Sequence, residues 1–240
     1  MSDGTPGPLG LVGSGEFTPA MRATDDALLD RVEEAGFERA VAVIPTAAAT
    51  EGEATVRRWF DMAHAHYDAL GAEVLEVDVR DRHGAMELRH VADVREVGLV
   101  YLSGGKADHL TSSLRGTPLL DAVLEQWRFG AGLVGCSAGA MTLAAAWPPF
   151  LPFSRSWGEG LGVLRDLAVV PHFDMVRRAT MGAINRIGRK VPAGLQLLGI
   201  DEDTALVHDD GWRTEGAGGA WTIDGDGVRP VDHEDLASPT

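Results

Sequence analysis

The chain has 240 residues, of which 45% are hydrophobic and 24% charged, and 21 basic against 36 acidic residues give a formal net charge of −15. This composition is that of a globular protein, and the length suits one large α/β domain or two small ones. The pI near 4.8 implies a field that repels nucleic acids and anionic membrane surfaces, so neither is expected as a partner.

Targeting and redox signals point to the cytoplasm. Residues 1–10 have neither the basic nor the apolar character of a leader, and no apolar run approaches the ~20 residues of a membrane span. The single cysteine, Cys136, excludes an internal disulfide and is consistent with a reducing compartment. We therefore expect a soluble cytoplasmic protein.

Strand-like and helix-like segments alternate along most of the chain. Short runs, most of them almost wholly apolar, predict buried strands of a parallel sheet; in order they are Leu9–Val12, Ala40–Ile44, 73–79, Leu99–Leu102, Gly132–Gly135 and Leu167–Val170. Helical spacing predicts a first helix capped by Thr18 and begun by Pro19, and further helices over 53–70, 118–127 and 138–146. The alternation predicts an α/β fold, a three-layer sandwich with a mostly parallel central sheet and sites at the carboxyl ends of its strands.

The character of the chain changes after Gly199. Short pieces separated by Asp-Gly and Gly-Gly turns predict antiparallel strands; they are Ala205–His208, Trp212–Thr214, Ala220–Ile223 and Val228–Val231. We interpret residues 205–231 as a hairpin extension on the edge of the main sheet. The chain, 1–240, is then a single domain with its core over 8–210, and residues 232–240 are expected to fray.

The motif with the clearest chemical meaning is Gly135–Gly139, sequence GCSAG, at a predicted strand-to-helix junction. In a G-x-S-x-G turn the flanking glycines relieve crowding, so a strained serine presents its Oγ at the edge of the sheet. The helix that follows directs backbone N–H groups at developing negative charge. The pattern favours Ser137 as a nucleophile over a glycine-rich turn that matches by chance.

Cys136 is a competing nucleophile, as in an amidotransferase that releases ammonia for a synthase partner. Only Ser137 has glycines both two residues before it and two residues after it, so the register favours the serine. The Cys136 thiol is then expected to pack as a small hydrophobic group.

A nucleophilic serine needs a base, and His172 is the best placed of the 8 histidines because it follows the predicted strand Leu167–Val170. Three acids follow another short apolar strand and can orient this imidazole, namely Asp201, Glu202 and Asp203. Spacing does not decide among them.

Two backbone N–H groups are the candidates for an oxyanion hole. Ala138 follows the serine directly, and Gly105 ends a neighbouring predicted strand, where glycine allows close approach of the backbone. His109 lies just beyond that turn and either lines the site or faces away from it on a helix. His64 and His66 are two residues apart on a predicted helix and therefore face different sides, which argues against a metal site.

Together these motifs resemble the serine peptidases of the dipeptidase E and cyanophycinase family, which have the fold of class I glutamine amidotransferases. The segments that carry the resemblance stand in the family's order: Leu11–Glu16, Leu102–Gly105, Gly135–Ala140, Pro171–Phe173 and Gly199–Ala205. The order serine, histidine, acid also differs from that of the α/β-hydrolases.

The resemblance implies a nucleophile, a base, an orienting acid and two oxyanion donors, which are Ser137, His172, Glu202, Gly105 and Ala138. Glu202 matches the acid of the cyanophycinase branch. The aspartate that the dipeptidase E branch has after its nucleophile helix has no counterpart in residues 143–153, which leaves Asp201 and Asp203 as reserves.

Departures from the family concern the substrate. Cyanophycinases follow the Gly-Gly turn with an acid and a glutamine, where this chain has Lys106 and Ala107, and they carry an arginine at the position of Val176. Specificity for β-aspartyl-arginine is therefore not implied. Lys106, Arg177 and Arg178 either bind a substrate carboxylate or are surface charges.

Two further features are candidates for substrate binding. Glu16, at the end of the first strand, either receives a substrate's amino group or simply precedes a helix. The aromatic segment Trp147–Phe153 either walls a substrate pocket or caps the core.

The resulting hypothesis is a serine-type peptidase that hydrolyses di- or tripeptides, acidic or Asp-containing ones among them, through an acyl-enzyme on Ser137. No metal or organic cofactor is implied, the expected partner is a small peptide, and an exposed edge strand would favour a homodimer. The rivals are the Cys136 amidotransferase, a small-ester or lactone hydrolase, and a noncatalytic binding module. A misplaced His172 or a closed pocket over Ser137 would favour the noncatalytic module.

Overall fold

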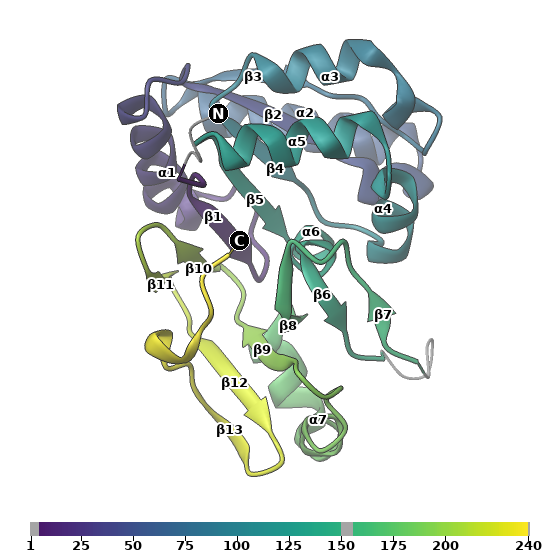
Figure 1. Ribbon diagram of the computed structural model, residues 1–240, viewed down its shortest axis with the longest axis vertical. Coiled ribbons are helices and arrows are strands. Elements are labelled where there is room, and N and C mark those ends of the chain that lie inside the picture. The colour runs from purple at the N-terminus through teal and green to yellow at the C-terminus, as the bar shows by residue number, and fades with distance from the viewer. Residues whose placement is uncertain (1–4, 150–155, 240) are drawn as a thin grey trace.

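The computed structural model describes residues 5–149 and 156–239, which form two β-sheets with helices packed around them (Figure 1). The larger sheet has the strand order β11-β10-β1-β5-β4-β2-β3. Its strands are β1 (Leu9–Val12), β2 (Ala40–Ile44), β3 (Glu73–Glu76), β4 (Leu99–Leu102), β5 (Gly132–Cys136), β10 (Thr204–His208) and β11 (Trp212–Gly216). Strands β1 to β5 pair in parallel, and β10 and β11 pair antiparallel at one edge.

Helices cover both faces of this sheet because its strands are apolar on both sides. The α-helices of the described residues are α1 (Arg22–Glu34), α2 (Glu53–Asp68), α3 (Leu88–Arg95), α4 (Ala107–Leu114), α5 (Pro118–Arg128), α6 (Ala138–Leu143) and α7 (Phe173–Gly188). Side chains of α1 and α2 pack with Val41, Val43 and Tyr101 on one face. Those of α3 to α6 pack with the alternate residues, such as Ile44 and Leu102, on the other.

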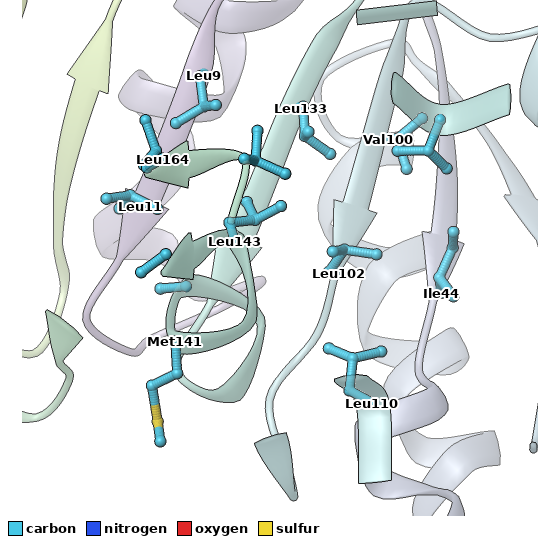
Figure 2. Packing of buried hydrophobic residues seen from close by; sticks show 14 of the residues in the cluster. Leu9, Leu11, Ile44, Val100, Leu102, Leu110, Leu133, Met141, Leu143 and Leu164 are labelled. Atoms are coloured by element: carbon cyan, nitrogen blue, oxygen red, sulfur yellow. The ribbon is translucent and has the colours of Figure 1, made fainter. Parts of the chain in front are cut away.

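The second of these two cores is continuous across the strands. Figure 2 shows leucine, isoleucine and valine side chains from β1, β5, β4 and β2 next to one another, with Met141 and Leu143 of α6 beside them. Each such fully buried side chain contributes about 1.5–3 kcal/mol of transfer free energy. This packing holds α6, and the turn before it, against the carboxyl ends of the strands.

The smaller sheet corrects the predicted architecture. It has the order β13-β12-β9-β8-β6-β7, with strands β6 (Ala144–Trp147), β7 (Gly158–Glu159), β8 (Leu164–Val170), β9 (Gln196–Ile200), β12 (Ala220–Asp224) and β13 (Gly227–Pro230). The predicted strand Leu167–Val170 is part of β8 and lies in this sheet, not in the larger one. The predicted extension divides between the sheets, because β10 and β11 join the larger one and β12 and β13 the smaller.

Of two local predictions, one was wrong and one was correct only in position. The helix expected over 138–146 ends at Leu143, and Ala144–Trp147 continues as β6, because pairing with β8 overrides the helical propensity of alanine. Thr18 occupies the N-cap position before Pro19, as predicted, but the element that begins there is a 3-10 turn, Pro19–Met21, ahead of α1, and the Thr18 hydroxyl donates to Asp203 Oδ1 at 3.2 Å instead of capping it.

The loop after β1 joins the two sheets. Gly13 N–H donates to Thr204 O at 2.9 Å, and Gly13 O accepts the His172 N–H at 3.3 Å. A Cβ on Gly13 would lie 2.1 Å from Asp201 O, so this approach of two backbones requires glycine. The contact brings the carboxyl ends of β8 and β9 to the carboxyl ends of β1 and β5. Among the described residues no helix is long and apolar enough to span a membrane.

Candidate active site

Ser137 occupies a strained turn between β5 and α6, with φ 50° and ψ −106°. The flanking glycines are required by space: a Cβ on Gly135 would lie 2.5 Å from the Gly139 carbonyl carbon, and one on Gly139 would lie 2.2 Å from Leu102 O. Strain of this kind persists only where the surroundings enforce it, and it clusters at functional sites. We refer to this turn between β5 and α6 as the elbow.

The elbow brings Ser137 to the predicted base. Ser137 Oγ lies 3.0 Å from His172 Nε2, and His172 Nδ1 lies 2.7 Å from Glu202 Oε1. His172 has a left-handed backbone, φ 50° and ψ 39°, directly before α7, and it reaches the serine from the end of β8. The His172 and Glu202 side chains are 41% and 36% exposed, so this side of the site is open to a ligand.

The structure distinguishes the three candidate acids. Asp201 is buried, and its Oδ2 accepts the Gly219 N–H at 3.0 Å and the Trp221 Nε1–H at 2.9 Å. Asp203 accepts the Thr18 hydroxyl. Only Glu202 contacts the imidazole, so Asp201 and Asp203 hold loops in place.

Asp174 is a site residue that the sequence analysis missed. It lies in the first turn of α7, and its Oδ1 accepts the Glu202 N–H at 3.1 Å. This bond fixes the backbone of the acid next to the helix that carries the base. An aspartate two residues after the histidine, in the first turn of a helix, was the available signal.

The two proposed oxyanion donors belong to the turn after β4 and to the start of α6, and both of these segments adjoin Ser137. Gly104 Cβ, if present, would lie 3.4 Å from Ser137 Cβ, which places the turn after β4 against the elbow. Gly105 follows with φ 139°, and a Cβ there would lie 2.4 Å from Ala47 O, so the turn admits only glycine. Ala138 begins α6 and directs its N–H away from the helix, as every first-turn residue does.

Glu16 has a different place from the one predicted. Its side chain is 6% exposed; Oε1 accepts the Gly104 N–H at 2.9 Å, and Oε2 accepts the Cys136 thiol proton at 2.9 Å. A carboxylate with both oxygens engaged beneath the surface does not receive a substrate's amino group. The substrate-binding role is therefore corrected to an internal one.

Cys136 lies in the interior, as the register of the motif predicted. Burial and the neighbouring Glu16 charge raise the pKa of this thiol well above its ordinary value. A protonated, fully buried thiol is a poor nucleophile, which argues against the amidotransferase reading.

The three candidate cations differ in their surroundings. The Arg177 guanidinium lies 4.3 Å from the centre of the Trp221 ring. Arg178 is 79% exposed and pairs weakly with Asp174 at 3.8 Å. Lys106 is exposed beside Gly105 at the start of α4, and no ion pair joins it to another described residue. Lys106 is the cation closest in sequence to an oxyanion donor.

The remaining candidates lie away from the chemistry or outside the described residues. His109 Nε2 bonds to Arg80 O at 2.8 Å, so its ring faces another loop. His64 contacts Glu76 and His66 contacts Asp25. Of the aromatic segment, Trp147 is buried, and residues 150–153 lie outside the described part of the chain.

Comparisons with known proteins identify the family of this chain. The model of Peptidase family S51 matches residues 9–214. Cyanophycinase from Synechococcus elongatus is 32% identical over 205 residues, which are 79% of this chain and 60% of that protein, and a second cyanophycinase, from Thermosynechococcus vestitus, matches to the same extent. The chain thus matches about three fifths of the length of these relatives.

Solved structures show the same fold. The crystal structure of a peptidase from an acI-B1 Actinobacterium superposes with a TM-score of 0.87 at 32% identity, covering 98% of both chains. A candidate peptidase E protein from Listeria monocytogenes EGD-e superposes with a TM-score of 0.57 at 18% identity, covering 89% of this chain and 100% of that one. At that identity the second likeness concerns the fold alone.

Proposed function

Because the chain belongs to Peptidase family S51, we propose that it is a serine-type peptidase that hydrolyses short peptides through an acyl-enzyme on Ser137. The observation that carries the proposal is the continuous contact from Ser137 Oγ through His172 to Glu202. A noncatalytic module would not need this alignment, and its expected sign, a misplaced His172, is absent from the described site.

The proposed reaction has two halves. Ser137 Oγ attacks the peptide carbonyl carbon while its proton passes to His172 Nε2, and Glu202 stabilises the imidazolium and holds its orientation. The N–H groups of Gly105 and Ala138 bind the oxyanion. His172 then gives the proton to the leaving amine, and water, activated by the same imidazole, cleaves the ester and restores the serine.

We propose that the preferred peptides carry an acidic side chain or a free carboxylate close to the scissile bond. Lys106 supports this part of the proposal, since it is an exposed cation one residue from a proposed oxyanion donor. A point charge on a flexible stem suits a single carboxylate. Of the two arginines on α7, Arg178 is exposed, whereas Arg177 is half-buried against Trp221.

The test compares the wild-type protein and Ser137→Ala on di- and tripeptides in matched Asp and Asn versions, with free amino groups as the readout. We expect release by the wild type and a fall in turnover of about 10⁶-fold in the variant, the loss typical of a missing triad serine. Lys106→Gln should lower kcat/KM for the Asp peptides and leave the Asn peptides unchanged. Release that survives in Ser137→Ala would contradict the proposal.

A further inference from the structure

We infer that Glu16 is a positioning residue that sets the separation of the two oxyanion donors, by binding the strand ends that carry both of them. This inference rests on the proposed function, since it concerns the same site. It replaces the substrate-binding role that the sequence indicated for this acid.

The carboxylate joins the ends of three neighbouring strands. Glu16 follows β1, and its two oxygens bind Gly104 after β4 and Cys136 at the end of β5, the central strand of the three. Gly104 directly precedes the donor Gly105, and Cys136 directly precedes the nucleophile. One rigid planar group therefore fixes both halves of the oxyanion hole relative to each other.

The bond to Gly104 also decides which amide is left for the oxyanion. The Gly104 N–H donates to Glu16 Oε1, so it is already engaged and is not left to bind an oxyanion. The next residue, with φ 139°, turns the chain so that successive N–H groups point in different directions. Without the Glu16 acceptor, the buried Gly104 N–H would have no partner and the turn would be free to rotate.

The space around the Glu16 carboxylate is also restricted. A Cβ on Gly104 would lie 2.5 Å from Glu16 Oε1, so the backbone and the acid are in direct contact. Preorganised donors contribute to catalysis only when they are held close to their productive positions. A side chain that replaces Glu16 must therefore have the same shape and also present a hydrogen-bond acceptor to the Gly104 N–H.

The test measures phosphonylation of Ser137 by a fluorophosphonate probe, a reaction that displaces fluoride and places charge on an oxygen in the oxyanion hole. It needs no identified substrate. Glu16→Gln keeps an oxygen for the Gly104 N–H and should react within a few-fold of the wild type. Glu16→Met keeps the length but not the acceptor, and should react about 10²-fold more slowly, the order expected for one lost oxyanion donor.

A matched control separates positioning from stability. Asp25 is a comparably buried acid, 1% exposed, that pairs with His66 on the face of α1 and α2. Asp25→Asn should lower the denaturation midpoint and leave the labelling rate of the folded protein unchanged. Near-ultraviolet circular dichroism gives the denaturation midpoint of each variant, and each labelling rate is measured under conditions below that midpoint.

The outcomes distinguish this inference from the proposed function. Wild-type labelling that disappears in Ser137→Ala, with slow Glu16→Met and fast Glu16→Gln and Asp25→Asn, supports the inference. A labelling rate in folded Glu16→Met equal to that of the wild type overturns the inference and leaves the proposed function intact. A slowing in Asp25→Asn as large as that in Glu16→Met has the same consequence. A wild-type protein whose Ser137 is not labelled overturns the proposed function, and the inference with it.

Discussion

At the scale of single residues, the account depends on which acid orients His172. Glu202 Oε1 lies 2.7 Å from His172 Nδ1. Replacing Glu202 with Gln keeps the shape of the side chain but removes the charge that stabilises the imidazolium. We expect Glu202→Gln to lower kcat by about 10⁴-fold with KM nearly unchanged.

Asp201→Asn is the control for that variant, because this acid binds the loop and the Trp221 indole instead. It should lower the free energy of unfolding by about 1–3 kcal/mol and leave kcat unchanged. Steady-state kinetics and denaturant titrations measure both effects; a larger loss of kcat in Asp201→Asn than in Glu202→Gln would reverse the assignment.

Cys136 offers a second prediction at this scale. Its raised pKa, caused by burial and by the Glu16 charge, keeps the thiol protonated at pH 8, so iodoacetamide should leave it unmodified until a denaturant unfolds the chain. Mass spectrometry of the native and unfolded protein measures this. Cys136→Ala removes one contact of Glu16, so it should slow peptide hydrolysis without abolishing it, whereas loss of all hydrolysis would favour the thiol as nucleophile.

At the scale of elements, the turn between β5 and α6 determines the geometry of Ser137, the proposed nucleophile. Gly139→Ala would place a methyl group 2.2 Å from Leu102 O. We expect it to cost about 1–3 kcal/mol through overpacking and to slow Ser137 labelling by displacing the elbow.

The matched control is Gly182→Ala, at an exposed position of α7 with open space around its Cβ. It should stabilise the protein by about 0.5–1 kcal/mol, the helical preference of alanine over glycine, and leave labelling unchanged. Thermal denaturation and labelling rates of the pair check both statements. Equal behaviour of the two variants would show that the elbow does not depend on glycine.

Sequence patterns predicted the elements that are buried on both faces. β1, β2 and β4 follow the apolar runs residue for residue, because such runs have few alternatives in a parallel sheet. Ala144–Trp147 was less predictable, since alanine favours helix and pairing with β7 and β8 makes the segment a strand. Tertiary packing decides which strands pair with one another. The sequence patterns therefore did not show that a second sheet holds β8, β9, β12 and β13.

At the scale of the whole molecule, the site depends on the meeting of two sheets. Ser137 comes from the larger sheet, and His172 and Glu202 lie at the ends of β8 and β9 in the smaller one. The order and spacing of these residues were readable from the sequence, as was the GCSAG turn. Three features could be found only in the structure, because each depends on residues distant in the chain. They are the contact of Glu202 with His172, the burial of Glu16, and the hydrogen bond from the Glu202 N–H to Asp174.

The most direct test of the central claim is to locate the acyl group during turnover. The wild-type protein is mixed with a cleaved short peptide, quenched in acid within the first turnovers, digested and analysed by mass spectrometry. The account predicts an acyl adduct on Ser137, lost in Ser137→Ala. An adduct on Cys136, or peptide cleavage that persists in Ser137→Ala with no adduct, would contradict it.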